Sequence, residues 1–169
     1  YNKCCAVSSF WYTKILKGGP EPIKQRDKRD LINIKSITKI FIPIFQNNHW
    51  TLVLFDSELK TISHLDSLDL LSSSSTIISN AKKYISYSFP SLANISWKTI
   101  STKNIPKQNN SIDCGVFVCM YARFIASGIS FNFNNDHIQV IRNHMFNEIR
   151  NVEIVDLNLD KESTSAPSD

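Results

Sequence analysis

Apolar and polar residues alternate with two different periods along this chain, and the change of period predicts where strands and helices lie. Short stretches rich in β-branched and aromatic residues, separated by turn-forming residues, predict strands over 38–45, 50–55, 60–65 and 95–101. Apolar residues at three- and four-residue spacing predict a helix over 4–17 and another that begins near residue 114. The serine run 72–75 leads into a predicted helix that ends near residue 88, and the last helix is predicted over 135–150. Pro43 interrupts the first strand pattern, which predicts an edge position or a bulge there.

This order of elements is typical of an α+β domain. A chain of 169 residues with 42% hydrophobic residues is long enough for one domain with a core and too short for two. We therefore predict one domain over residues 1–152. Residues 153–169 lack apolar periodicity and are predicted to be a polar, disordered tail. The chain begins with tyrosine instead of methionine, so we expect the domain to be truncated at its N-terminus.

The formal charge of +4 adds little to this picture. Basic residues gather between residues 14 and 39, but no nucleic-acid-binding motif accompanies them, and a solvated basic face explains them equally well. No apolar stretch is long enough to span a membrane, and no secretory signal is present. We predict a monomer inside the cell, in the nucleus or the cytoplasm, that binds neither nucleic acid nor membrane.

Four cysteines are present: Cys4, Cys5, Cys114 and Cys119. They form no Cys-x-x-Cys pair, and no histidine pair has metal-ligand spacing, so we predict reduced thiols and no metal site. Cys4, Cys5 and Cys119 are predicted to be packing residues of the core.

Cys114 stands at the predicted start of a buried helix. Asp113 before it is a good N-cap residue, and apolar residues recur at helical spacing after it. The unpaired N–H groups and the positive dipole of a helix N-terminus favour a thiolate over a thiol. Gly115 carries no side chain that would block another chain from approaching the sulfur. The position suits a nucleophile, but buried structural cysteines are common, so catalysis requires partners.

A general base must come from one of four histidines: His49, His64, His137 and His144. If the second and third strands form a hairpin that turns at residues 57–58, His49 faces Asp66 directly, and the carboxylate can orient the imidazole. His64 is the competing base, but it would face Thr51, and its strand neighbour Asp66 would be poorly directed at its ring. Geometry favours His49. The alternative that both histidines are half-exposed strand residues stays open.

An acyl-transfer site also needs a donor for the oxyanion. Gln108, six residues ahead of Cys114, can place its side-chain amide beside the Cys114 backbone N–H. Taken alone, Gln108 is equally well an ordinary loop glutamine.

Three groups of residues follow one another in a distinctive order: His49-Trp50, Leu65-Asp66-Ser67, and the segment from Pro106 to Gly115 with Gln108, Asn110, Asp113 and Cys114. In this order the chain resembles the ubiquitin-like-protein proteases, the Ulp/SENP family of SUMO-processing cysteine peptidases. The similarity runs from residue 1 to about residue 150 and includes a closing segment with Phe131, Phe133, Asp136, Arg142, Met145, Glu148 and Ile149. It implies the papain-like fold, with a central, mostly antiparallel sheet flanked by helices and the nucleophile at the N-terminus of a buried helix.

The resemblance also implies a role for each residue of the site. Cys114 would be the nucleophile, His49 the general base and acid, Asp66 its orienter and Gln108 the oxyanion donor. Trp50 would line the channel that admits a modifier's Gly-Gly tail. The implied activity is cleavage, without a cofactor, after the C-terminal Gly-Gly of SUMO or a related ubiquitin-like modifier, in precursors or in conjugates.

Two departures from the family pattern concern the substrate channel and the turn before the cysteine. Tyr1 stands where the family has a second channel tryptophan, so we assign it to substrate binding. Ser111 replaces a usual glycine, and Asn110 is expected to supply a positive φ in its place. Two other functions stay open: an inactive domain that only binds the modifier, and an acyltransferase with a similar Cys/His/acid arrangement.

Overall fold

The structure is a computed structural model that describes residues 3–18, 37–70, 74–157 and 159. Within these residues the strands form a five-stranded sheet in the order β1-β2-β3-β4-β5. They are β1 (Cys4–Ala6), β2 (Lys39–Gln46), β3 (His49–Asp56), β4 (Thr61–Leu65) and β5 (Lys98–Thr99). The central strands β2, β3 and β4 pair antiparallel, and the short outer strands are parallel to their neighbours. The first three predicted strands are confirmed, whereas the fourth contributes only Lys98–Thr99.

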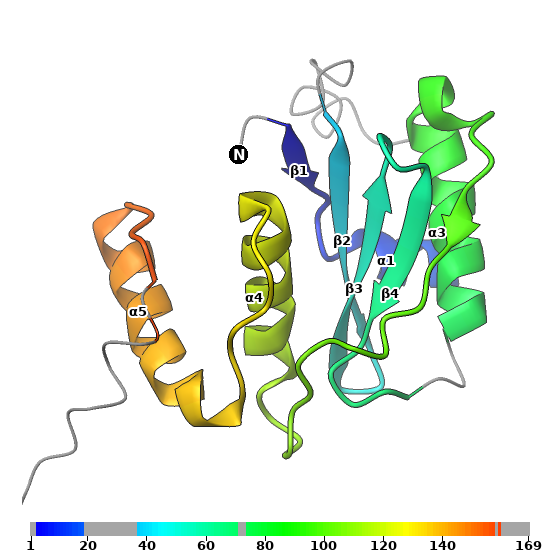
Figure 1. Cartoon of the computed structure of the whole chain (residues 1–169). Helices are drawn as coiled ribbons and strands as arrows, with labels where there is room; N and C mark the ends of the chain where they lie inside the picture. The colour runs from blue at the N-terminus through cyan, green and yellow to red at the C-terminus, as the bar shows by residue number, and fades with distance from the viewer. Residues whose placement is uncertain (1–2, 19–36, 71–73, 158, 160–169) are drawn as a thin grey trace, which may run out of the picture.

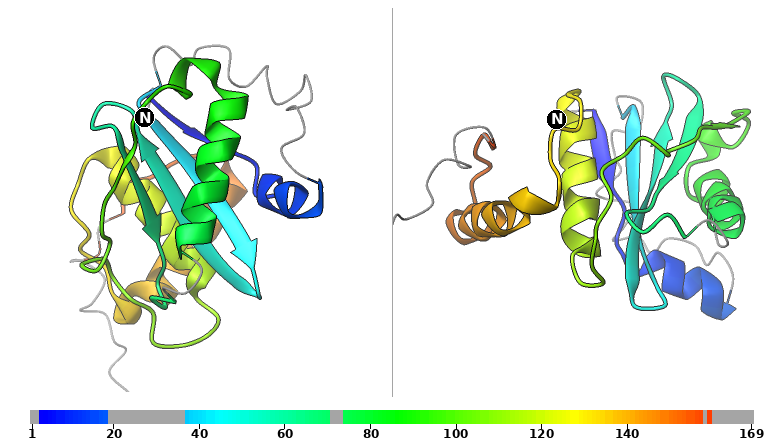
Figure 2. Two further views of the ribbon diagram at one scale, coloured as in Figure 1. Left: turned by 90° about the vertical axis from the view of Figure 1, so that its right-hand side faces the viewer. Right: turned by 60° about the horizontal axis from the view of Figure 1, so that its bottom comes forward.

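Helices cover both faces of the sheet (Figures 1 and 2). On one face lie α1 (Trp11–Gly18) and α3 (Ser74–Ser88), on the other lies α4 (Cys114–Ser127), and α5 (Ile138–Asn151) lies beyond α4. Among the described residues, η3 (Pro90–Leu92) and η4 (Asn135–His137) are short 3-10 helices. The α+β class is confirmed, as are the helices predicted to end near residue 88, to begin near residue 114 and to cover 135–150.

Both faces of the central strands are buried, because helices cover each side of the sheet and alternate residues of a strand point to opposite sides. Ile40, Ile42 and Ile44 of β2 join the apolar cluster under α1 and α3, whereas Phe41 joins the cluster under α4. A strand buried on both faces is strongly fixed in register, so the residues at its ends keep defined positions.

The helix predicted over residues 4–17 is wrong in its first half. Cys4–Ala6 form β1, which pairs with Lys39–Phe41 of β2, and the Val7 N–H donates to the Phe41 carbonyl at 2.8 Å. The helix begins only at Trp11. Backbone pairing with a distant strand outweighs local helical spacing, which is a weak signal over so few residues.

Pro43 lies in the part of β2 that has no described partner on its outer side, because β1 pairs only with Lys39–Phe41. The missing N–H of proline therefore costs no hydrogen bond of the ladder. The predicted edge position is thus confirmed for this half of β2, whereas the first half of the strand lies between β1 and β3.

Residues at the start of the predicted tail contact the domain. The Val155 N–H donates to the Glu148 carboxylate of α5 at 2.9 Å, and Leu159 is buried in the cluster under α4. We therefore propose a domain that extends to about residue 159. The rest of the tail, Tyr1 and most of the basic stretch lie outside the described residues. None of the helices in the described part of the chain has the length and apolar character needed to cross a membrane.

Candidate active site

His49 is placed by the tight turn between β2 and β3. Asn47 and Asn48 adopt positive φ values of 53° and 58°, and Gln46 pairs with His49 across them. Asparagine suits this two-residue hairpin because it tolerates the left-handed conformation. His49 is therefore the first residue of β3, at the end of the sheet where β4 finishes and α4 begins (Figure 1).

The next hairpin, from β3 to β4, has a longer loop than predicted. Asp56 pairs with Thr61, so the loop holds residues 57–60. The Asp56 carboxylate accepts the N–H groups of Glu58 and Leu59 at 3.1 and 3.0 Å, which stabilises this loop in place of a two-residue turn at 57–58. The predicted register is therefore wrong by two residues.

This shift changes which residues face each other across the ladder. His64 faces Val53 instead of Thr51, and His49 is not directly opposite Asp66. A shift of two residues nevertheless keeps every side chain on its own face of the sheet. His49 reaches Asp66 diagonally, and its Nε2 lies 2.6 Å from Asp66 Oδ1.

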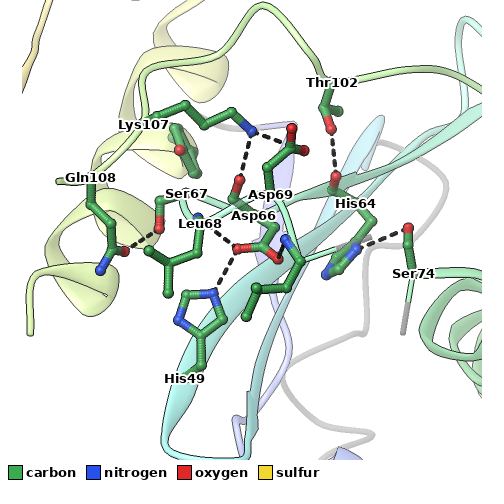
Figure 3. Close-up of polar contacts among 12 residues, drawn as sticks. His49, His64, Asp66, Ser67, Leu68, Asp69, Ser74, Thr102, Lys107 and Gln108 are labelled. Atoms are coloured by element: carbon green, nitrogen blue, oxygen red, sulfur yellow. Dashed lines mark hydrogen bonds and ion pairs between the residues drawn. The ribbon is translucent and has the colours of Figure 1, made fainter. Parts of the chain in front are cut away.

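The Asp66 carboxylate is held by three donors. Besides His49, the N–H group of Leu68 donates to it (Figure 3), as does that of Leu70, both at 2.9 Å. Burial alone would raise the pKa of Asp66, but the hydrogen bond from His49, the two backbone N–H groups and the charge of His49 outweigh burial and hold that pKa below its usual value. Asp66 is therefore ionised at neutral pH. It fixes a proton on His49 Nε2 and leaves Nδ1 for proton exchange with another group.

His64 does not pair with Asp66. Its ring points to α3, where Nδ1 lies 3.1 Å from the Ser74 hydroxyl (Figure 3), and its Nε2 has no hydrogen-bond partner among the described residues. Burial lowers the pKa of His64 to about 4, against an opposing contribution from the Asp66 charge. His64 is a neutral residue of the interior, whereas His49 is the histidine that the carboxylate orients.

Buried His64 predicts a loss of stability on mild acidification. Between its usual pKa of 6.5 and its folded value of about 4, the unfolded chain binds a proton at this residue that the folded protein does not. The contribution of neutral His64 to the free energy of unfolding is therefore fully present above about pH 6.5. That free energy falls by at most about 3 kcal/mol as the pH approaches 4. Urea unfolding at a series of pH values should show this decline in wild type and a shallower one in His64→Phe. Equal slopes in both proteins would show that other groups carry the acid sensitivity.

Cys114 is the first residue of α4 and is 5% exposed. The beginning of β3 lies against this end of the helix, since a methyl group at Gly115 would lie 3.7 Å from Trp50 Cδ1. The residue after His49 thus adjoins the residue after Cys114. At 3.7 Å such a methyl group would make ordinary contact, so the chain's own packing does not require glycine there.

Gln108 is buried and held at both ends of its amide. Its Oε1 accepts the Ser67 hydroxyl (Figure 3), and its backbone N–H donates to the Ser67 carbonyl at 3.1 Å. Its Nε2 donates to the Asn110 carbonyl at 2.6 Å. An amide nitrogen carries two hydrogens, so one remains for a ligand.

The turn before Cys114 closes without a left-handed residue, and the expected positive φ at Asn110 is wrong. The Asn110 side chain replaces it: Oδ1 accepts the N–H groups of Ile112 and Asp113 at 3.0 and 3.1 Å. An asparagine that bonds its own backbone two and three residues on forms a tight turn, so Ser111 needs no special conformation.

Lys107 and Tyr121 support this site and were missed from the sequence. The Lys107 ammonium donates to the Asp66 carbonyl at 2.9 Å and pairs with Asp69 at 3.3 Å. The Tyr121 hydroxyl donates to the Pro106 carbonyl at 2.5 Å. These contacts join segments that are far apart in the chain, so no local pattern indicates them.

The other cysteines divide between core and surface. Cys5 and Cys4 pack against the two apolar clusters as predicted, and burial raises the pKa of Cys5 to about 11, with a smaller effect of the Cys4 charge. The prediction that Cys119 is a core residue is wrong, because it is exposed while its neighbours Val118 and Met120 are buried. The described residues contain no group of three or more His, Cys, Asp or Glu side chains that could hold a metal ion.

A thiol at the start of a buried helix, packed against a sheet whose end carries an oriented histidine, is the arrangement of the papain-like cysteine proteases. The chain belongs to the Ulp1 protease family, because residues 2–155 match the model of that family's C-terminal catalytic domain.

Known relatives agree with this assignment. Ubiquitin-like-specific protease 1 of Saccharomyces cerevisiae is 31% identical over 144 residues, which cover 83% of this chain and 23% of that protein. Sentrin-specific protease 2 of Homo sapiens is 28% identical over 162 residues, covering 92% of this chain and 27% of that protein. The chain thus spans about a quarter of the length of these relatives.

Solved structures show the same fold. The C-terminal Ulp1 protease domain in complex with Smt3, the yeast ortholog of SUMO, superposes with a TM-score of 0.76 at 29% identity, covering 87% of this chain and 67% of that domain's chain. The papain-like fold expected from the sequence is therefore confirmed.

Proposed function

We propose that this chain is the catalytic domain of a cysteine protease that cleaves after the C-terminal Gly-Gly of SUMO or a related ubiquitin-like modifier. The observation that carries the proposal is the His49–Asp66 pair, 2.6 Å apart, at the end of the sheet that adjoins the start of α4. Membership of the Ulp1 family and the likeness to a protease domain bound to Smt3 support the choice of substrate.

The proposed reaction begins with transfer of the Cys114 thiol proton to His49 Nδ1. The sulfur then bonds to the carbonyl carbon of the modifier's last glycine, and the carbonyl electrons move onto the oxygen. The Cys114 N–H and the free Gln108 amide hydrogen would stabilise this oxyanion. When the electrons return, the C–N bond breaks and His49 protonates the leaving amine. Water, deprotonated by His49, cleaves the thioester to release a carboxylate and restore the thiol.

Gln108→Ala should lower kcat by about 10²- to 10³-fold with little change in KM, because the lost hydrogen bond forms fully only in the transition state. Steady-state kinetics on a modifier with a fluorogenic C-terminal group measure both constants. Gln139→Ala, an exposed glutamine on α5, is the matched control and should behave as wild type. A rise in KM with unchanged kcat would assign Gln108 to substrate binding instead.

Trp50 is proposed to line the channel for the modifier's tail, supported by its place beside Gly115 and its packing on Phe45, with ring centroids 4.8 Å apart. The role of Tyr1 stays a prediction. We further propose that the protein is a monomer. We also propose that it acts in the nucleus or the cytoplasm, where reducing conditions keep Cys114 and the other three free thiols reduced.

The function is tested by assaying the purified domain against a panel of ubiquitin-like modifiers with C-terminal reporters. Release of the reporter from SUMO, and no release from unrelated modifiers, is expected. Binding of SUMO without cleavage, and without covalent capture of an electrophilic SUMO probe, would identify an inactive binding domain. Product formation that depends on an acyl donor would identify an acyltransferase.

A further inference from the structure

Asp113 occupies the N-cap position of α4 but does not cap the helix. Among the described residues, its side chain accepts no hydrogen bond from the N–H groups of the first turn. Arg142 of α5 donates to Oδ1 at 2.5 Å, and Asn110 donates to Oδ2 at 2.6 Å. The carboxylate is thus drawn away from the helix that begins with Cys114.

This placement matters because an aspartate at an N-cap ordinarily accepts the N–H of the second or third helical residue. A carboxylate in that position would lie beside the N–H groups of the first turn, and its negative charge would oppose both an oxyanion held there and a thiolate on the adjoining residue. The Asp113 side chain is 10% exposed, so solvent screens its charge weakly.

The charge of Asp113 is compensated where the side chain is held. Burial alone would raise the pKa of Asp113, but the hydrogen bonds from Arg142 and Asn110 and the charge of Arg142 outweigh burial and keep that pKa below its usual value. At neutral pH the site therefore holds an ionised carboxylate paired with a guanidinium, with no net charge beside the sulfur.

The same contacts reach the expected oxyanion donor. Asn110, which donates to Asp113, accepts Gln108 Nε2 on its backbone carbonyl, and Gln108 Oε1 accepts the Ser67 hydroxyl. Arg142 is therefore the outer end of a continuous series of hydrogen bonds that runs through the turn before Cys114 to the Gln108 amide.

We propose that Arg142 is a positioning residue for the reaction, which holds the Asp113 carboxylate off the N-terminus of α4 and fixes the turn that orients Gln108. The inference rests on the proposed function. Arg142 touches no reacting atom in this role and acts only through Asp113. Its loss is expected to impair the chemical step and to leave modifier binding unchanged.

The test compares wild type with Arg142→Met, Arg142→Lys and Arg150→Met, the last an exposed arginine of the same helix. Enzyme concentrations are set by titrating Cys114 with an electrophilic SUMO probe, and kcat and KM are measured on a fluorogenic SUMO substrate. Arg142→Met should lower kcat by about ten- to hundredfold at unchanged KM. Arg142→Lys should recover part of this loss because it keeps the charge, and Arg150→Met should match wild type.

A double-variant cycle tests whether Arg142 acts through Asp113. Asp113→Asn combined with Arg142→Met should be no slower than Asp113→Asn alone, and this comparison also holds if Arg142→Met folds poorly, because the double variant leaves no unpaired carboxylate. The inference would be overturned if the kcat losses of the two single variants multiplied in the double variant, or if Arg142→Met had the same kcat as Arg150→Met. Both outcomes presuppose an active wild-type domain. A wild-type domain that cleaves no modifier would refute the proposed function itself, and this inference with it.

Discussion

Replacing Cys114 with serine is expected to abolish cleavage, with a fall in kcat of roughly 10⁴- to 10⁶-fold. A hydroxyl is a much weaker acid than a thiol, so transfer of its proton to His49 is far less favourable. The change replaces one sulfur by oxygen at a residue that is 5% exposed, so the surface that binds a modifier is unaltered.

Precursor processing followed on gels measures the loss of cleavage, and calorimetry with mature SUMO measures the retained affinity. Cys119→Ser, in the same helix but on its exposed side, is the matched control and should cleave as wild type does. Processing of a precursor by Cys114→Ser would show that another residue is the nucleophile.

Replacing Asp66 with asparagine is expected to lower kcat by about 10⁴-fold while the fold is retained. An amide has nearly the shape of the carboxylate, but its nitrogen cannot accept the His49 Nε2–H, and its oxygen carries no charge to stabilise an imidazolium. If the amide oxygen takes the place of Oδ1, the amide NH2 group meets the Leu70 N–H instead, so the tautomer that leaves Nδ1 free for the Cys114 proton is held less firmly. Because the pKa of Asp66 lies below its usual value, the residue stays ionised on mild acidification, so wild-type activity lost near pH 5 to 6 must be assigned to another group.

Asp69→Asn is the control for this variant. Its carboxylate lies in the same loop and pairs with Lys107, but the pair is 30% and 48% exposed and is expected to contribute little. Measuring kcat from pH 5 to 9 for both variants distinguishes a loss at every pH, which a wrong His49 tautomer would cause, from a shift of the pH optimum. An Asp66→Asn enzyme within a few-fold of Asp69→Asn would mean that Asp66 does not orient the base.

The sequence and the structure agree best where a single element decides the outcome. The strands around residues 38–65 have strong β-forming composition, and the helix that begins at Cys114 has a sustained apolar face, so each pattern indicates its element directly. The helix prediction for residues 4–17 was wrong in its first half for the opposite reason. The apolar residues there suit either period, and only the edge of β2, supplied by a distant part of the chain, makes Cys4–Ala6 a strand.

The contacts of the candidate site likewise include one that the sequence predicted and one that it did not. His49 and Asp66 were paired from a hairpin whose register was wrong, and the pairing survives because a shift of two residues preserves the face of each side chain. Asp113 was expected as an ordinary N-cap, and nothing in its neighbourhood along the chain indicates that Arg142 would take its carboxylate.

The sequence by itself determined the class of fold, the location of the thiol at a helix start and the residue types able to act on it, because these follow from local periodicity, local turn chemistry and a family resemblance. Only the tertiary structure decided which histidine the carboxylate orients, which way the N-cap aspartate turns and which residues support the glutamine amide. These outcomes depend on hydrogen bonds between segments that meet only after folding, and a bond of about 3 Å is sensitive to register and loop length, which apolar spacing does not encode.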